Sequence, residues 1–349
     1  MSRYAQRIRD VAEPEMRVSV MRASHLDLPR TLRALLPVQR NAPQLVVPRN
    51  GPIDLVHFTD IYIAIHARRF RAPRVTTVHD LIPLDHSSWR TVSKARWRLS
   101  YLRSLRALPH SDVVITPSKY TRDVLLTVRD LDPDRVCAVP ILVPAQFRPP
   151  ALGSKRQPRT ILSVGTTADY KNIPLLLHAL ARPELRGTQL VRVGKPFDED
   201  LRSLASTLGI EDRLVEWSSV SDEMLVELMH EATVLAQPSL DEGFGMPVAE
   251  AMAAGLPVVA SDGGALPEVV GDSGRVVPLR NHKPGLLDFD DVRDFAAALA
   301  ETLDSETLRA EISRSQLAEV ARFRAEPVRE ALFAAYAAAR EFATVRTGT

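Results

Sequence analysis

The sequence predicts an α/β protein made of two domains, each built on a parallel sheet. The chain has 349 residues, which is more than one hydrophobic core usually serves, so two domains are expected. Short β-branched runs alternate with helix-like segments along the chain, which is typical of strands joined by helices. A proline-rich stretch without periodicity, residues 141–160, separates the two halves and is expected to contain the linker.

The composition excludes several classes of protein. Forty-five basic residues face 43 acidic ones, which is too balanced to make nucleic acid the expected partner. The single cysteine, Cys137, supplies neither a disulfide framework nor a cysteine metal site. The sequence has no metal-spaced histidine pair, and neither a metal nor a cofactor is expected.

Localisation is inferred from the distribution of apolar residues. Nowhere do 18 apolar residues run together, and the N-terminal segment has no apolar signal region. A cytoplasmic protein is therefore expected, with the inner face of the membrane as an alternative.

In the first half, polar residues follow several of the predicted strands. Because parallel sheets bind ligands at the carboxyl ends of their strands, these residues are candidates for a binding site. Ser118 also follows a strand, but it is predicted to cap a helix rather than to act as a nucleophile. The candidates for the site are His57, Thr59, Asp60, His79 and Asp80.

A basic, aromatic segment covers residues 89–109 and contains no acidic residue. Such a helix can lie on an anionic membrane surface or contact a lipid phosphate. It can equally present a solvated arginine face while its aromatic side chains pack in the core. Both interpretations stay open. The basic residues are Arg90, Lys94, Arg96, Arg98, Arg103 and Arg106, and the aromatic ones are Trp89, Trp97 and Tyr101.

The second half opens with a strand, a loop and a helix over residues 160–181. Gly165 closes the strand, and Lys171 lies in the loop just before the helix. The start of a helix favours a phosphate, and a lysine adds a point charge there. Lys195, after the next strand, is a second cation near the same edge.

The stretch 237–261 combines the end of a strand, a glycine loop and the start of a helix. Residues 233–239 are predicted to form a buried strand, and Gly245 allows a tight loop. A helix is predicted over 247–254 and a further parallel strand over 256–260.

This junction has the features of a phosphate site flanked by acids. The amides of Phe244, Gly245 and Met246, together with the helix dipole, favour an anion. Glu242 and Glu250 flank the loop, which suggests a ligand with hydroxyl groups, such as a ribose and a sugar. Alternatively, Glu250 only complements the helix dipole and Glu242 is a solvated loop acid.

The complete string PSxxEGFGxPxxEAMAxGxPVV, residues 238–259, resembles the signature of the retaining glycosyltransferases of the glycogen-synthase-like family 4, also called group 1. The resemblance implies the GT-B fold, in which two Rossmann-like parallel-sheet domains face each other across a cleft. It divides the chain into an acceptor-side domain 1–145, a linker 146–160, a donor domain 161–325 and a helix 326–349 that crosses back.

The resemblance also implies roles for the central residues. Glu250 would hold the ribose hydroxyls of a nucleotide-sugar, and Glu242 the hydroxyls of the transferred sugar. Lys171, with Gly165, would contact the donor diphosphate. The place after Gly165, where many members carry an arginine, is occupied by Thr166, so one phosphate cation is either missing or supplied by Lys195.

On the acceptor side, the resemblance places His79 opposite the donor sugar. Asp80 would orient this histidine or meet the acceptor, and His57, Thr59 and Asp60 would line the acceptor pocket. The chain lacks the Gly-Gly loop that follows the first strand in many members, which weakens the acceptor assignments most. The expected catalytic residues are thus Glu242, His79 and Lys171.

The reaction that the resemblance implies is transfer of a hexose, such as mannose or glucose, from a UDP- or GDP-linked donor to an acceptor hydroxyl. It would proceed with retention and without a metal, in polysaccharide or glycolipid synthesis, on a glycan or lipid-linked acceptor. Two alternatives stay open. One is a nucleotide-sugar hydrolase or epimerase of the same fold, and the other is a catalytically silent partner subunit, suggested by Thr166 and the missing Gly-Gly loop.

Overall fold

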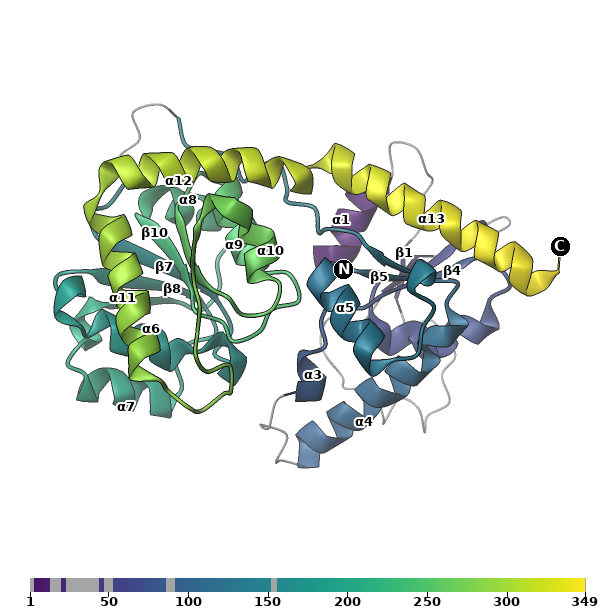
Figure 1. Ribbon diagram of the computed structural model, residues 1–349, viewed down its shortest axis with the longest axis horizontal. Coiled ribbons are helices and arrows are strands. Elements are labelled where there is room, and N and C mark those ends of the chain that lie inside the picture. The colour runs from purple at the N-terminus through teal and green to yellow at the C-terminus, as the bar shows by residue number, and fades with distance from the viewer. Residues whose placement is uncertain are drawn as a thin grey trace. The chain divides into compact units, whose positions relative to one another are not determined.

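The computed structural model describes residues 3–12, 20–22, 44–46, 53–85, 92–151 and 156–348. They pack as two compact units. Unit 1 consists of Met1–Leu142 and Phe323–Thr349, and unit 2 of Val143–Arg322. Each unit is built on one six-stranded sheet with helices around it (Figure 1), so the predicted class of two Rossmann-like α/β domains is confirmed.

The sheet of unit 1 is parallel from β3 to β6 and antiparallel at one edge, where β1, β2 and β3 pair. Strand β2 was not predicted from the sequence. The strands, in sheet order, are β1 (Val20–Arg22), β2 (Gln44–Val46), β3 (Val56–Phe58), β4 (Arg74–Thr77), β5 (Val113–Thr116) and β6 (Val136–Ala138).

Helices from both ends of the chain cover this sheet. The C-terminal helix α13 lies against β4 and β5 and also contacts α1 (Figure 1). Its Leu332 and Tyr336 share one buried cluster with Ile8, Val75 and Ile115. The helices are α1 (Arg3–Ala12), α3 (Ile82–Asp85), α4 (Val92–Ala107), α5 (Lys119–Val128) and α13 (Ala325–Thr347), with 3-10 turns η2 (Ile61–Arg69), η3 (Leu108–His110) and η4 (Pro133–Arg135).

The sheet of unit 2 is entirely parallel, and its strands follow the doubly wound order β9-β8-β7-β10-β11-β12. The strand order reverses between β7 and β10, and ligands of such sheets bind at the carboxyl ends of the strands at this switch point. The strands are β7 (Thr160–Gly165), β8 (Gln189–Gly194), β9 (Leu214–Trp217), β10 (Val234–Gln237), β11 (Val258–Ser261) and β12 (Arg275–Val277).

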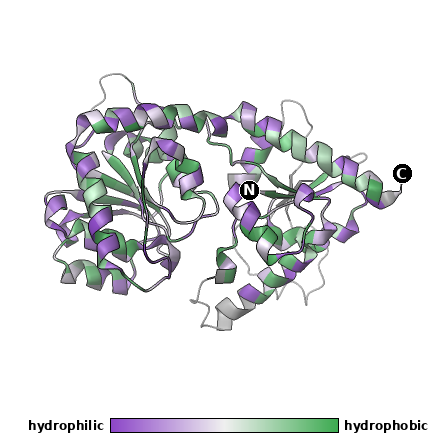
Figure 2. Ribbon diagram, in the orientation of Figure 1, coloured by the Kyte–Doolittle hydropathy of each residue, from purple (hydrophilic) through white to green (hydrophobic). Residues whose placement is uncertain are grey.

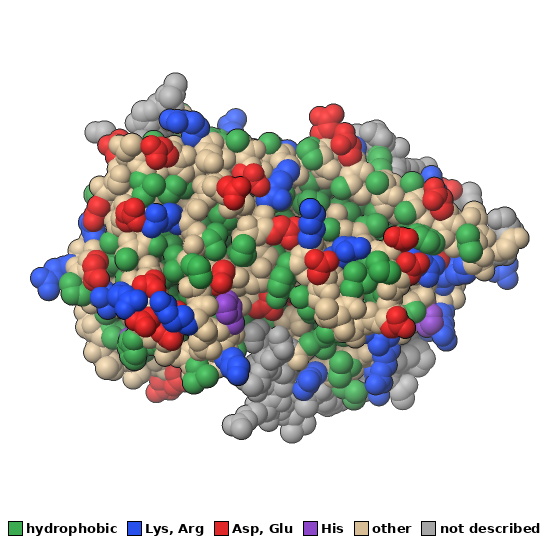
Figure 3. All heavy atoms as spheres, viewed as in Figure 1, with side chains coloured by type: hydrophobic (Ala, Val, Ile, Leu, Met, Phe, Trp, Pro, Cys, Tyr) green, Lys and Arg blue, Asp and Glu red, His purple; other side chains and the backbone are tan. Residues whose placement is uncertain are grey.

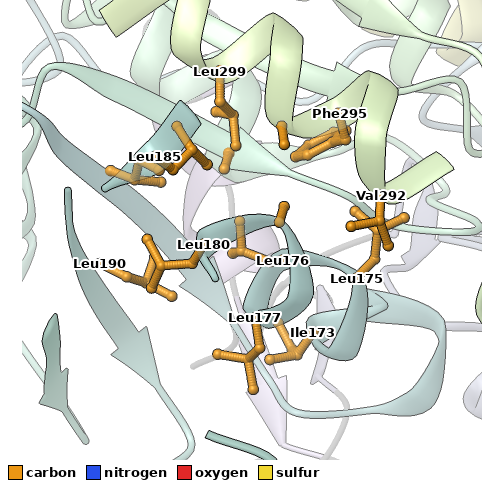
Figure 4. Close-up of a cluster of buried hydrophobic side chains, with 14 of the residues drawn as sticks. Ile173, Leu175, Leu176, Leu177, Leu180, Leu185, Leu190, Val292, Phe295 and Leu299 are labelled. Atoms are coloured by element: carbon orange, nitrogen blue, oxygen red, sulfur yellow. The ribbon is translucent and has the colours of Figure 1, made fainter. Parts of the chain in front are cut away.

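The largest buried cluster of unit 2 lies between its sheet and two helices. Leu176 and Leu180 of α6 meet Phe295 and Leu299 of α11 (Figure 4), and each such side chain contributes about 1.5–3 kcal/mol when it is buried. The helices are α6 (Ile173–Leu180), α7 (Glu199–Thr207), α8 (Asp222–Glu231), α9 (Met246–Ala253), α10 (Leu266–Val270), α11 (Phe289–Asp304) and α12 (Glu306–Glu319), with turns η5 (Asp169–Lys171), η6 (Pro183–Leu185), η7 (Glu211–Arg213), η8 (Gly271–Ser273) and η9 (Val320–Phe323).

Local sequence signals explain where several helices begin. The Ser118 hydroxyl accepts a hydrogen bond from the Thr121 amide at 3.0 Å, and the Ser221 hydroxyl accepts one from the Met224 amide at 3.2 Å. The predicted N-cap of α5 at Ser118 is therefore confirmed, and Ser221 caps α8 in the same way.

The distribution of apolar and charged residues over the structure agrees with the balanced composition of the chain. The strands are mainly apolar, while the helices alternate between apolar and polar residues (Figure 2). On the face seen in Figure 3, basic and acidic side chains are interspersed. Among the helices that the structure describes, none is long and apolar enough to cross a bilayer.

Candidate active site

The centre of the candidate site is the loop between β10 and α9. Helix α9 begins at Met246, one residue before the predicted start, and Gly245 precedes it with φ +94°. A side chain at Gly245 would place its Cβ 2.7 Å from Leu266 Cδ2. The backbone angle therefore favours glycine at this position, and any other residue would also have to displace the Leu266 side chain.

Glu242 is fixed through one of its two carboxylate oxygens. Its Oε1 accepts hydrogen bonds from Lys171 Nζ at 2.5 Å, Gln237 Nε2 at 2.8 Å and Ser239 Oγ at 2.8 Å. The residue is only 7% exposed. Within the described chain its Oε2 makes no hydrogen bond, so this oxygen remains available to a ligand while the carboxylate is held in one orientation.

Lys171, which follows the end of the neighbouring strand β7, is part of the same site. It closes η5, directly after the loop that follows β7, and is 9% exposed. Its ammonium also lies 5.2 Å from the centre of the Tyr170 ring, within the range of a cation–π contact. A lysine ammonium carries three N–H donors, and Glu242 takes one of them. Since β7 and β10 are the strands of the switch point, the Lys171–Glu242 ion pair marks the position where a ligand is expected.

The remaining donor-side candidates surround these strand ends. Gly165 ends β7 beside Gly194 of β8, where an added Cβ would lie 1.9 Å from Gly165 O. Thr166 and Lys195 follow these glycines and are exposed. Glu250 lies in the second turn of α9, and it is 4% exposed. Phe244 precedes Gly245 in the loop and is 5% exposed.

Most of the predicted acceptor-side residues lie together in unit 1. His79 Nε2 is 2.9 Å from Thr59 O. Asp60 Oδ1 accepts a hydrogen bond from the Tyr62 amide at 2.9 Å. Burial raises the pKa of Asp60, while the Tyr62 amide and the nearby His79 partly offset this. Burial raises the pKa of Tyr62, and the charges of Asp60 and Asp80 raise it further. These groups therefore form one electrostatically linked cluster at the carboxyl ends of β3 and β4.

His57 is the exception among the acceptor-side candidates. It is 1% exposed, with Nδ1 2.9 Å from Tyr336 Oη and Nε2 2.8 Å from Thr77 Oγ1. Both ring nitrogens thus have protein partners, which leaves none for an acceptor. The interpretation of His57 as a pocket residue needs correction, because it rested on strand position and the partner in α13 lies 279 residues away in sequence.

The buried His57 predicts acid sensitivity of unit 1. Burial, followed by the charge of His79, lowers the pKa of His57 to about 3, whereas an unfolded histidine titrates near 6.5. Between these values only the unfolded chain takes up the proton, so stability falls as the pH drops from about 6.5 towards 3. We expect about 2 kcal/mol of unfolding free energy to be lost between pH 7 and pH 5, as measured by urea titration.

The matched variant for this prediction is His57→Gln, which keeps a polar side chain but cannot be protonated. It should show a smaller loss of stability between pH 7 and pH 5 than the wild type. An equal loss in both proteins would assign the acid sensitivity to other groups.

The basic segment forms helix α4 and the residues beside it. Tyr101 is 2% exposed in a buried cluster with Leu105, and its hydroxyl donates to Asp80 O at 2.5 Å. Arg98, Arg103 and Arg106 are exposed. Residues 89–91 and the side chains of 92–97 lie outside the described residues, as do residues 152–155 of the predicted linker. Membrane association through this segment stays a prediction.

Sequence comparison connects these features with known proteins. A family model described as "Glycosyl transferases group 1" matches residues 146–319, and one described as "Glycosyltransferase Family 4" matches residues 4–147. Together they cover nearly the whole chain.

Two relatives and one solved structure illustrate the similarity. The chain is 32% identical over 226 residues to the MMP alpha-(1->4)-mannosyltransferase of Mycolicibacterium hassiacum, covering 61% of this chain and 54% of that protein. It is 35% identical over 159 residues to the GDP-mannose:cellobiosyl-diphosphopolyprenol alpha-mannosyltransferase of Komagataeibacter xylinus, covering 44% and 40%. The chain thus spans about half the length of these relatives.

The structural match concerns the fold. The Anabaena protein Alr3699/HepE, solved with UDP and glucose, superimposes with a TM-score of 0.65 at 18% identity, over 81% of this chain and 77% of that one. With the doubly wound sheet of unit 2 and the two family models, this similarity identifies the chain as a member of the group 1 glycosyltransferases with the GT-B fold.

Proposed function

We propose that this protein transfers a hexose from a nucleotide-diphosphate sugar to an acceptor hydroxyl, with retention at the anomeric carbon and without a metal. The observation that carries the proposal is the buried Lys171–Glu242 ion pair at the switch point of unit 2. It joins a cation suited to a diphosphate to a carboxylate suited to sugar hydroxyls, at the edge where doubly wound sheets bind nucleotides.

In the proposed mechanism, the protein stabilises the charge that grows on the leaving diphosphate. Lys171 keeps one N–H on Glu242 and directs its remaining donors to the phosphate oxygens. The loop amides before α9 and the positive end of its dipole add to this stabilisation. Glu242 Oε2 accepts a hydrogen bond from a hydroxyl of the transferred sugar. The acceptor hydroxyl attacks the anomeric carbon on the face that the diphosphate leaves, without a protein nucleophile. As the new bond forms, the bond from this carbon to the diphosphate breaks and the hydroxyl proton passes to the departing diphosphate.

The substrates in this proposal follow from the relatives and from the sequence. Two relatives are named as mannosyltransferases, and one name specifies GDP-mannose and a diphosphopolyprenol-linked acceptor. Mannose or glucose linked to GDP or UDP is therefore the proposed donor. The proposed acceptor is a glycan or a lipid-linked sugar, which the cluster of Asp60, His79 and Asp80 would contact.

A thermal-shift screen with UDP-, GDP- and ADP-linked hexoses tests donor binding, since a ligand at 100 times its dissociation constant adds about 2.7 kcal/mol of stability. A transfer assay with the stabilising donor follows, with and without EDTA, and NMR of the product gives the anomeric configuration. Turnover without any acceptor would instead indicate a hydrolase or epimerase. Tight donor binding without turnover across an acceptor panel would indicate a silent subunit.

Glu250→Gln is expected to weaken both the nucleotide-sugar and the free nucleoside diphosphate by about 1.5–3 kcal/mol, because a charged acceptor for the ribose hydroxyls is lost. The Michaelis constant for the donor should rise while turnover at saturation changes little. Glu227→Gln, an exposed acid of α8, is the matched control. Unchanged nucleotide affinity in Glu250→Gln would leave Glu250 with only a structural role in α9.

A further inference from the structure

Strand β8 contains a charged residue where an interior strand usually carries an apolar one. Arg192 is 2% exposed and lies in register between Ser163 of β7 and Glu216 of β9. Burial lowers the pKa of its guanidinium to about 10, and the charge of Glu216 partly offsets this. A buried cation is costly unless its donors are satisfied, so its partners are informative.

The partners of Arg192 are backbone carbonyls at the end of β7. Nη2 donates to Gly165 O at 2.9 Å and to Thr166 O at 2.6 Å, and Nη1 is 3.4 Å from Ser163 O. Its Nε has no hydrogen-bond partner in the part of the chain that the structure covers. The planar guanidinium therefore binds the carbonyl oxygens of two consecutive peptide groups in the loop between β7 and η5.

These two hydrogen bonds determine where the amides of the same peptide groups point. The structure has no cis peptide bond in its described residues, and in a planar trans peptide the N–H points opposite to the C=O. With the carbonyls of Gly165 and Thr166 turned towards Arg192, the amides of Thr166 and Thr167 point away from it. Neither amide donates a hydrogen bond to any described residue.

Two adjacent open amides form a concave backbone site for an anion. Lys171 borders this site, because its Nζ lies 3.7 Å from where a Cβ of Gly165 would be. The next residue, Thr166, has an uncharged side chain. An anion at this site would therefore be bound by the backbone amides of the loop and not by a charged side chain at that position.

We propose that Arg192 is a positioning residue that presents the amides of Thr166 and Thr167 to the diphosphate of the donor from beneath the loop. The identification of the ligand as the diphosphate of a donor rests on the proposed function. Arg192 does not touch the ligand itself. It acts by holding two peptide planes in one orientation.

The test combines Arg192→Lys, which keeps the charge but loses the planar fork, with Arg192→Met, which loses both. In the ligand-free protein, 15N relaxation should show order parameters of Thr166 and Thr167 falling from about 0.85 to below about 0.6 in both variants. Affinity for UDP or GDP, whichever the wild type binds, should fall at least about tenfold, while affinity for the matching nucleoside stays within about twofold.

Arg213→Lys is the matched control, because Arg213 donates to two carbonyls at 2.9 and 2.6 Å in the same unit, but to Leu185 O and Leu180 O. It should leave both affinities and the loop order parameters unchanged. Rigid amides in both Arg192 variants, or equal losses of nucleoside and diphosphate affinity, would overturn the inference. If the wild type bound neither UDP nor GDP, the proposed function would fail, while the order parameters would still decide the role of Arg192.

Discussion

Lys171→Met is expected to lower turnover by about 10²–10³-fold, because one preorganised donor to the developing charge of the leaving diphosphate is lost. It should also lower the free energy of unfolding by about 3–5 kcal/mol, since Glu242 would keep a carboxylate in the interior without its cation. The side chains are 11% and 9% exposed, so solvent screens the pair little. Steady-state rates and urea unfolding measure the two effects.

Glu242→Gln and the double variant complete this experiment. Glu242→Gln should also reduce turnover strongly, but it should leave the affinity for free nucleoside diphosphate within about threefold, a difference under about 1 kcal/mol. The double variant should lose less stability than the sum of the single losses, because neither charge is left alone. Additive losses would show that the two side chains do not interact in solution. Wild-type turnover in all three proteins would remove both residues from the mechanism.

Asp112→Asn is expected to destabilise unit 1 by about 3–5 kcal/mol, the usual cost of breaking a buried ionic network by removing one partner. The carboxylate is fully buried. It accepts hydrogen bonds from the Arg74 amide at 2.9 Å and the Arg346 Nε at 2.7 Å, and both guanidiniums contact it further. Urea unfolding at neutral pH measures the loss. Asp123→Asn, in a pair whose carboxylate is 68% exposed, is the control and should cost less than about 1 kcal/mol.

The same network has a predictable pH dependence. Burial raises the pKa of Asp112, but hydrogen bonds from Arg346 and Arg74 outweigh it, and the pKa is lowered overall. The stabilisation is therefore complete above the ordinary aspartate range and is lost as the pH falls through the lowered pKa. A variant whose stability matches the wild type at pH 7 would contradict both parts of this prediction.

The sequence predicted those features that depend on neighbouring residues. The start of α9 differs by one residue from its prediction, and the cap at Ser118 lies where expected. Glycine loops, N-caps and β-branched runs act over a few residues, so their signals can be read locally. The resemblance of residues 238–259 to a family signature identified the fold for the same reason.

The contacts that complete the candidate site were not predictable in this way. Lys171 and Glu242 were assigned to different parts of a ligand, but they bind each other across 71 residues of sequence. Gln237 and Ser239, which orient Glu242, looked like ordinary strand-end residues. Arg192 lies within an apolar run, and the sequence alone assigns it no role. Only its partners at the end of β7 give it a role. Such pairings are set by which strands become neighbours in the sheet, and this information is not local.

The position of α13 has a consequence for the order in which the chain can fold during its synthesis. One buried cluster of unit 1 includes Leu332 and Tyr336 of α13, but these residues follow all of Val143–Arg322 in the chain. Every residue of unit 2 is therefore synthesised before this cluster of unit 1 can be completed. Unit 1 cannot finish its core ahead of unit 2, as an N-terminal domain usually does during synthesis.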